Sequence, residues 1–194
     1  MAPRAIEKPD AARDFSEFGL RAGKSADQFQ RFSEAMKLHM FNSQVIIAPL
    51  TTEDLSCVRQ LLVDGLTERW GTYEARQNPD IEMLPLGYQD SVFLVAKLSG
   101  HVVGSGILRP IGPDRGEICR ISVAVSYRRA GIGSLILSHL LCRASELHMR
   151  EACLETTSSW DSAVKFYIRH GFRRTHVEGS SSYFSYGLRK GGPS

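Results

Sequence analysis

Residues 117–133 read Glu-Ile-Cys-Arg-Ile-Ser-Val-Ala-Val-Ser-Tyr-Arg-Arg-Ala-Gly-Ile-Gly, and no other stretch of the chain is as informative. Its apolar first half predicts a buried strand, and the glycines at its end open an amphipathic helix. Because glycine has no Cβ, the backbone of such a turn can approach a ligand closely. The N–H groups of the first helical turn have no intrahelical acceptor and favour negative charge. We therefore predict a pyrophosphate-binding turn between a strand and a helix.

The neighbouring residues narrow the kind of phosphate site. Arg128 and Arg129 precede Gly131 and Gly133 and add positive charge beside the turn. A P-loop would need Lys followed by Ser or Thr after the glycines, and that pair is absent here. A dinucleotide-binding turn would read Gly-x-Gly-x-x-Gly, which is absent as well. The remaining pattern, Arg-x-x-Gly-x-Gly, is short, so its interpretation depends on the strand before it and the helix after it.

The composition limits the class of protein. The 194 residues suit one domain, and 42% hydrophobic with 23% charged residues is typical of a globular protein. The net charge of +3 comes from interspersed basic and acidic residues, so we expect neither a nucleic-acid surface nor a membrane surface. No apolar run reaches about 18 residues, which argues against a membrane span. The N-terminus lacks the apolar core of a signal peptide.

The cysteines and histidines predict no metal site. Cys57, Cys119, Cys142 and Cys153 lie far apart in apolar segments, without the spacing of a metal site or a disulfide framework. We therefore expect buried free thiols in a reducing compartment, which is cytoplasmic or nuclear. The six histidines are scattered, and none has a partner at metal-ligand or triad spacing, so we assign none a catalytic role.

Two parts are expected along the chain. Residues 1–43 form an N-terminal extension with a helix at about 25–40, and residues 44–190 form the main domain. The expected elements of the main domain are a strand at 44–49, a helix capped by Thr51 or Thr52, an irregular segment at 70–90, a hairpin of 91–98 and 101–109, a strand at 117–125, the helix after the glycines, a strand at 151–157, a helix at 161–170, and a last hairpin of 172–177 and 182–188. This order predicts an α+β or α/β layered fold around a mixed sheet.

Three segments together resemble the GNAT superfamily of acyl-CoA N-acyltransferases. They are Ile121-Ser-Val-Ala-Val125, Arg128-Arg-Ala-Gly-Ile-Gly133 and Ala163-Val-Lys-Phe-Tyr-Ile-Arg-His-Gly-Phe172, the last of which resembles a segment of the family's fourth helix. The resemblance covers roughly residues 44–190. It implies a strongly twisted mixed sheet of six to seven strands whose fourth and fifth strands splay apart. Acyl-CoA would lie between them, in a cleft walled by 117–125 and 151–157.

The resemblance also implies which residues bind acetyl-CoA, the co-substrate that we expect. Backbone groups of Val123, Ala124 and Val125 would line the pantetheine arm, and Tyr167 would touch the same cofactor. The amides that would hold the pyrophosphate, with Arg128 beside them, belong to Arg129, Ala130, Gly131, Ile132, Gly133 and Ser134. Val125 stands where many members have proline, and Trp160 stands where members often have asparagine.

Amide formation from a thioester needs a stabilised oxyanion and a protonated leaving thiolate. Alignment of both substrates in one cleft and a backbone N–H at the oxyanion would each lower the barrier by several kcal/mol. We predict the N–H of Val123 as that donor and Tyr167 as the general acid, because a phenol pKa near 10 matches a thiol. The alternative for Tyr167 is a packed side chain whose hydroxyl binds a backbone carbonyl.

Two glutamates compete for the role of general base. Strand alternation would place Glu117 on one face with Cys119, Ile121, Val123 and Val125. Glu117 also lies eleven residues before Arg128, as the base does in the histone-acetyltransferase-like branch of the family. The alternative for Glu117 is a surface ion pair with Arg115 or Arg120. Glu155, on the neighbouring strand, would act as base or bind the acceptor's ammonium group.

The acceptor is the least determined part of the prediction. Trp70, Tyr73 and Tyr88, with Glu74 and Asp80, would shape a pocket for an amine, or the aromatic residues would simply belong to the core.

We predict an N-acetyltransferase that moves an acetyl group to a primary amine of a small molecule or a peptide by direct attack in a ternary complex. No cysteine lies in a base-paired motif, which argues against a covalent intermediate. The alternatives are a lysine or N-terminal protein acetyltransferase, a non-catalytic acyl-CoA-binding module, and an interaction protein assembled through the helix at 25–40. The exposed edges of the last hairpin favour a homodimer.

Overall fold

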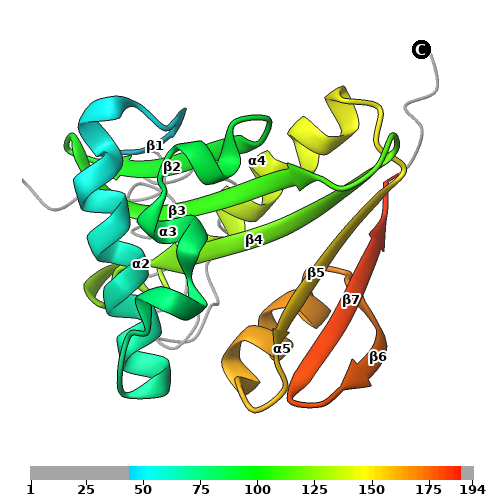
Figure 1. Cartoon of the computed structure of the whole chain (residues 1–194). Helices are drawn as coiled ribbons and strands as arrows, with labels where there is room; N and C mark the ends of the chain where they lie inside the picture. Colours follow the sequence, from blue (N-terminus) through cyan, green and yellow to red (C-terminus); the bar gives the residue numbers. More distant parts are fainter. Residues whose placement is uncertain (1–43, 189–194) are drawn as a thin grey trace, which may run out of the picture. The chain divides into compact units, whose positions relative to one another are not determined.

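A seven-stranded mixed sheet organises the described part of the chain, residues 44–188, in this computed structural model. The strands lie in the order β1-β2-β3-β4-β5-β7-β6, and neighbours are antiparallel except β4 and β5, which are parallel (Figure 1). This topology confirms the predicted α+β layered fold. The predicted helix at 25–40 and the rest of the N-terminal extension lie outside the described residues.

The order of strands and helices matches the sequence prediction. The strands are β1 (Val45–Pro49), β2 (Val92–Leu98), β3 (His101–Pro110), β4 (Arg115–Val123), β5 (Glu151–Thr157), β6 (Arg173–Glu178) and β7 (Ser181–Gly187). The helices are α2 (Leu55–Trp70), α3 (Pro79–Glu82), α4 (Ile132–Glu146) and α5 (Asp161–Arg169). Short 3-10 turns are η2 (Thr52–Asp54), η3 (Ala75–Gln77), η4 (Leu86–Tyr88) and η5 (Val125–Tyr127). The segment predicted to be irregular, 70–90, thus contains α3 and two of these turns.

Helices cover both faces of the sheet and bury two hydrophobic cores. The larger core lies against α4 and α5 and includes Ile136, Leu140, Leu154 and Phe184. The smaller core lies against α2 and α3 and includes Val58, Ile81, Phe93 and Ile107. The two faces are called the α4 face and the α2 face below. In Figure 1, α2 and α3 cover β2 to β4, whereas no helix lies over the same side of β5, β7 and β6.

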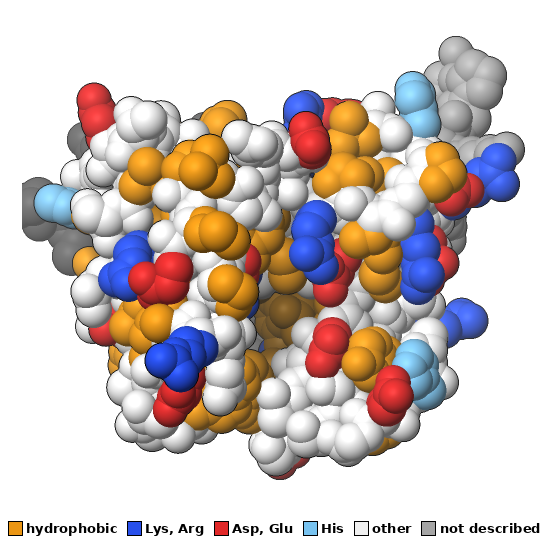
Figure 2. Space-filling model, in the orientation of Figure 1, with side chains coloured by type: hydrophobic (Ala, Val, Ile, Leu, Met, Phe, Trp, Pro, Cys, Tyr) orange, Lys and Arg blue, Asp and Glu red, His pale blue; other side chains and the backbone are white. Residues whose placement is uncertain are grey.

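β4 and β5 pair only briefly and then separate. Their parallel register joins Arg115 to Glu151, Gly116 to Ala152 and Glu117 to Cys153, and ends there. Beyond these residues β4 continues against β3, and β5 continues against β7, so the two strands diverge (Figure 1). This is the predicted splay. Figure 2 shows a hollow at this place, and we call it the β4–β5 cleft, walled by residues 118–123 and 154–157.

A bulge in β4 overturns the predicted alternation of its side chains. Arg120 has a φ of 53°, and the register with β3 shifts between Ser105 and Ile107. Before the bulge Cys119 packs into the smaller core, and after it Ile121 packs against the larger one. The two residues therefore lie on opposite faces, because an extra residue reverses the order in which side chains point. Glu117 and Cys119 face α2, whereas Ile121 and Val123 face α4.

Two smaller predictions were also wrong. The strand ends at Val123, and Val125 lies in the 3-10 turn η5 instead of continuing β4. The four cysteines are free thiols as expected, but Cys57 and Cys142 are exposed, not buried. Both lie on helices, where the 3.6-residue period turns them away from the apolar side of α2 and α4.

Candidate active site

The turn between β4 and α4 has the geometry of an anion site. Gly131 caps α4 with a φ of 83°, and Arg129 has a φ of 62°, so the backbone turns sharply just before the helix begins. Glycine adopts this left-handed conformation without steric cost, which is why Gly131 suits the position. Gly133 lies inside the first turn, where its Cα approaches the ring of Phe166 from α5.

The amides of this turn are available to a ligand. Within residues 44–188 no acceptor receives the backbone N–H of Arg129, Ala130, Gly131, Ile132, Gly133 or Ser134; the first helical bond of α4 runs from Leu135 to the carbonyl of Gly131. These groups and the helix dipole favour a phosphate. His170 holds the turn from α5, with 2.9 Å between its Nε2 and the Ser134 Oγ. The turn therefore fits the pyrophosphate of the expected cofactor.

Arg128 is paired with a carboxylate of α2. Its guanidinium forms two hydrogen bonds of 2.6 Å with the carboxylate of Glu68 on α2, and its Nε donates to the carbonyl of Val123 at 2.9 Å. The hydrogen bond from Arg128 lowers the pKa of Glu68, so the carboxylate stays ionised. The Arg128–Glu68 ion pair thus fastens α2 to the end of β4. Arg129, which is exposed, carries the formal charge that remains beside the turn.

The end of β4 offers one amide to the cleft. The N–H of Ala124 donates to the carbonyl of Val103 on β3 at 3.0 Å. Because neighbouring residues of a strand point their backbone groups in opposite directions, the N–H of Val123 points away from β3 and into the β4–β5 cleft. The amide of Ala124 is therefore occupied, whereas that of Val123 is placed for a ligand.

Tyr167 lies buried at the base of this cleft. Its ring packs against Phe172 and Phe184, and only 9% of its surface is exposed. Its hydroxyl has no hydrogen-bond partner in the described chain, which excludes the predicted alternative of a bond to a carbonyl within residues 44–188. Burial raises the pKa of Tyr167, the nearby Cys119 raises it further, and the charge of Arg69 opposes both. The phenol is therefore a protonated donor without an acceptor.

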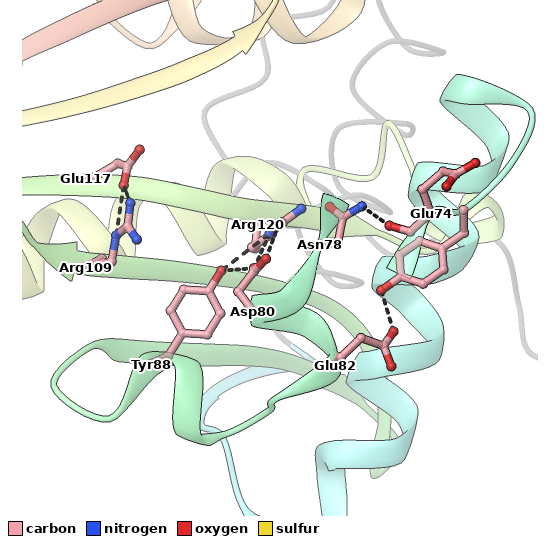
Figure 3. Close-up of polar contacts among 9 residues, drawn as sticks. Glu74, Asn78, Asp80, Glu82, Tyr88, Arg109, Glu117 and Arg120 are labelled. Atoms are coloured by element: carbon pink, nitrogen blue, oxygen red, sulfur yellow. Dashed lines mark hydrogen bonds and ion pairs between the residues drawn. The ribbon is translucent and has the colours of Figure 1, made fainter. Parts of the chain in front are cut away.

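Glu117 is held in an ion pair. It stands opposite Arg109 in the β3–β4 register, and the Nε of Arg109 donates to its carboxylate at 3.0 Å (Figure 3). Its partner is thus neither Arg115 nor Arg120, the two arginines considered from the sequence. Glu117 also lies at the last position where β4 pairs with β5, so it marks the closed end of the cleft.

Glu155 is placed farther along the open part of the cleft. Ala152 and Leu154 of β5 point into the larger core, so Glu155 points to the opposite face, the one that Glu117 shares. Its carboxylate accepts a hydrogen bond of 2.5 Å from Ser181 and has no cationic partner in the described chain. Glu155 is therefore a free, exposed carboxylate beside the cleft.

Neither of the cysteines near the cleft is a nucleophile. Burial raises the pKa of Cys119 to about 12, and the charge of Glu117 adds to this effect. Burial likewise raises the pKa of Cys153. Both thiols are neutral near pH 7, and a neutral thiol is a poor nucleophile.

Asp80 cannot bind a substrate amine, because its carboxylate is already paired. Arg120 donates to both of its oxygens at 2.8 Å, and the hydroxyl of Tyr88 donates to one of them (Figure 3). Burial alone would raise the pKa of Asp80, but the bonds from Arg120 and Tyr88 outweigh it and lower the pKa. The bulge in β4 directs Arg120 to this network, which ties the 79–88 segment to the sheet. Tyr88 is thus a core residue, and Glu74 is exposed.

Nothing in the sequence indicated that Arg69 contacts Trp160 near the cleft. Arg69 lies over the ring of Trp160, with its Cζ 4.5 Å from the ring centroid, and Trp70 packs against the same ring at 5.4 Å. Arg69 and Trp70 end α2, whereas Trp160 caps α5, so the contact joins the end of α2 to the start of α5. No local pattern could have revealed it, since the residues are far apart in the sequence.

Two kinds of feature are absent from residues 44–188. No group of three His, Cys, Asp or Glu residues within 44–188 is arranged to hold a metal ion. Among the helices of the same residues, none combines the length and apolarity needed to cross a bilayer.

Comparison with known proteins identifies the kind of fold and site. A model described as the acetyltransferase (GNAT) family matches residues 55–172. The probable N-acetyltransferase camello of Xenopus tropicalis is 33% identical over 101 residues, which is 51% of this chain and 46% of that protein. The amino-acid acetyltransferase of Mycobacterium tuberculosis is 28% identical over 138 residues, which is 70% of this chain and 71% of that protein. The chain thus spans less than half of the first relative.

Solved structures share the fold. An acetyltransferase of the GNAT family from Staphylococcus aureus has a TM-score of 0.69 at 17% identity and covers 75% of this chain and 99% of its own. PaiA N-acetyltransferase from Thermoplasma acidophilum, in complex with coenzyme A, has a TM-score of 0.67 at 20% identity, with coverages of 74% and 98%.

The Asp80–Arg120 pair predicts a pH-dependent loss of stability. The two side chains are 25% and 22% exposed, so Asp80→Asn leaves a largely buried guanidinium unpaired and should lower the free energy of unfolding by about 2–3 kcal/mol. The pKa of Asp80 is lowered from 3.8, so its contribution is complete above that pH and is lost as pH falls through the folded-state pKa. Urea unfolding from pH 7 to pH 2 should show the two proteins converging in acid.

A matched variant on the same segment controls this measurement. Glu82 pairs with Arg59 at the surface, so Glu82→Gln should change stability much less than Asp80→Asn. Equal losses in the two variants at pH 7 would show that the network does not hold the segment.

Proposed function

Because the chain belongs to the acetyltransferase (GNAT) family, we propose that it transfers an acetyl group from acetyl-CoA to the primary amine of a small molecule. The observation that carries the proposal is the buried Tyr167 hydroxyl, which has no partner in the described chain and lies at the cleft that leads to the amide-lined turn. A phenol left without an acceptor in a protein interior is unfavourable unless a substrate supplies one.

Different residues around the cleft bind different parts of acetyl-CoA. The turn amides from Arg129 to Ser134 and the side chain of Arg129 bind the pyrophosphate, which fixes one end of acetyl-CoA. The N–H of Val123 binds the pantetheine arm or, near the thioester, the carbonyl oxygen. An N–H that meets the developing oxyanion stabilises it by about 3 kcal/mol. The cofactor thus lies along the α4 face, and the amine approaches from the α2 face.

Proton transfer is assigned to two side chains. The amine nitrogen attacks the thioester carbon, a C–N bond forms, and the C–S bond breaks. Tyr167 gives its proton to the leaving thiolate, and the positive charge of Arg69 stabilises the resulting phenolate. Glu155 accepts the proton of the amine, directly or through a water molecule, because it is the carboxylate beside the cleft that no cation neutralises within residues 44–188. Glu117 is the weaker candidate, because Arg109 occupies it.

A small-molecule acceptor is favoured over a protein. The Mycobacterium tuberculosis relative that aligns over 70% of the chain is named for an amino-acid acceptor. In addition, the contacts of Arg69 and Trp70 with Trp160 join α2 to the start of α5 across the mouth that we assign to the acceptor. A peptide would need an open groove there.

The pyrophosphate site can be tested by charge at Gly133. A Cβ at this residue would lie 3.6 Å from the nearest atom of Phe166, which is ordinary contact, so Gly133→Asp should fold. Its carboxylate would repel the phosphates, and we expect the Kd for acetyl-CoA to rise at least tenfold, or about 1.4 kcal/mol. Titration calorimetry measures it, with Gly133→Asn as the uncharged control. Equal affinities of the two variants at low salt would place the pyrophosphate elsewhere.

The general acid can be tested by removing one oxygen atom. Tyr167→Phe should lower kcat by roughly 10²–10⁴, the usual contribution of a positioned acid, and leave the Kd for acetyl-CoA nearly unchanged. Thiol release from acetyl-CoA against a panel of amines measures the rate. Tyr186→Phe, which removes a phenol oxygen on β7, should keep full activity. Unchanged turnover in Tyr167→Phe would leave a non-catalytic acyl-CoA-binding module as the better proposal.

The two glutamates can be separated by their amide variants. Glu155→Gln should lower kcat/KM most strongly at the acidic side of the pH profile, because the ammonium form of the acceptor then has no local base. Glu117→Gln should have a smaller effect, since it only breaks the ion pair with Arg109. The reverse order of effects would assign the base to Glu117.

A further inference from the structure

Arg69 is an unpaired cation among paired ones. Of the arginines around the cleft, Arg109 binds Glu117, Arg120 binds Asp80, and Arg128 binds Glu68. Arg69 has no carboxylate and no hydrogen-bond acceptor in the described chain, although Glu68 precedes it in the sequence. Arg128 occupies both oxygens of Glu68 at 2.6 Å, so that carboxylate is taken.

The guanidinium of Arg69 is nevertheless held in place. Its Cζ lies 4.5 Å from the centroid of the Trp160 ring. The ring of Trp70 packs against the same Trp160 ring, with 5.4 Å between the two centroids. An indole face attracts a cation but offers no acceptor oxygen, so the N–H donors of Arg69 remain free for a ligand. Burial of part of the side chain and the charge of Arg128 lower the pKa of Arg69, although the nearby Glu68 opposes this effect.

Arg69 lies near one of the proposed reacting groups, and a second borders the same cleft from β5. Its charge acts on the phenol of Tyr167, the proposed general acid. Glu155, on the β5 wall, is a carboxylate without a cation within residues 44–188. A free cation and a free carboxylate thus flank the same cleft on the face from which the acceptor approaches.

The geometry points to an acceptor of the amino-acid type, with its carboxylate bound by Arg69 and its ammonium group directed to Glu155. This inference rests on the proposed function and names the substrate class for the same site. A planar guanidinium binds a carboxylate through two parallel hydrogen bonds, and such charge-assisted bonds are stronger than neutral ones.

Acetyl-CoA brings no negatively charged group to Arg69. Its phosphates belong at the turn amides beside Arg129, whereas Arg69 lies near Tyr167, where the thioester has to be. The pantetheine arm at that end carries no charge, so it has nothing with which to neutralise a guanidinium. An acceptor carboxylate is the group that remains.

The first test compares acceptors that differ only in the carboxylate. Wild type should acetylate L-leucine with a kcat/KM at least tenfold above that for 3-methylbutylamine, the same amine without the carboxylate. Arg69→Gln should lower kcat/KM for leucine roughly ten- to hundredfold more than for 3-methylbutylamine, because both reactions lose the charge beside Tyr167 but only leucine loses the carboxylate contact. Arg76→Gln, an exposed arginine of η3 without a partner in the described residues, is the matched control. Acetyl-CoA affinity should be equal in all three proteins.

The second test needs no turnover. Trp70 and Trp160 are the two tryptophans of the whole chain, so intrinsic fluorescence reports directly on the ring beneath Arg69. N-acetyl-L-leucine, which keeps the carboxylate, should shift the emission of wild type and of Arg76→Gln in a saturable way. N-acetyl-L-leucinamide should not, and Arg69→Gln should respond to neither.

The outcomes separate the two proposals. Acetylation of 3-methylbutylamine as good as that of leucine, with both rates lowered by the same factor in Arg69→Gln, would overturn the carboxylate site and keep the acetyltransferase. Absence of turnover with a saturable, Arg69-dependent response to N-acetyl-L-leucine would support the site and overturn the catalytic proposal. A fluorescence response that is the same for the carboxylate and the amide would reject Arg69 as the binding group.

Discussion

The parting of β4 from β5 is the constraint on which the rest of the structure depends. The two strands pair from Arg115 to Glu117 and then leave two unpaired edges in the middle of a sheet. Backbone groups that are withdrawn from water need partners, so such an interior gap is stable only when it is lined and filled appropriately. Side chains approach the gap from both faces, with α5 bringing Tyr167 from one side and α2 bringing Arg69 from the other, but neither pairs with the strand edges in the described chain. The backbone groups of these edges are therefore available to the substrates of the proposed reaction.

Most of the arginines around the gap are paired with carboxylates. Arg109, Arg120 and Arg128 each take one carboxylate, and these pairs fix β3 to β4, the 79–88 segment to the sheet, and α2 to the end of β4. Each of these arginines therefore holds elements of the fold together. Arg129, Arg69 and Glu155 lie near the turn and the cleft and have no ion-pair partner in the described chain.

The fold was largely predictable, and so was the conformation of the turn proposed to bind the cofactor. Strand alternation, helix caps and turn residues are local signals, and they placed nearly every element in order. The turn from Arg129 to Ser134 is likewise a contiguous motif whose conformation follows from its glycines. The acceptor half was not predictable, because Arg69 and Trp160 meet through tertiary packing. The bulge at Arg120 was also invisible, and it reversed the facing of Ile121 and Val123 relative to Glu117.

The sequence by itself determined the layered fold, the anion-binding turn and the Tyr167 helix, since each is encoded within a few consecutive residues. Only the tertiary structure decided which charges are free. Arg128 and Asp80 looked like functional groups and proved to be paired, whereas Arg69 carried no signal and proved to be unpaired. The physical reason is that pairing depends on distances between segments far apart in the chain. Electrostatic energy falls with distance and rises with burial, and no local pattern specifies either.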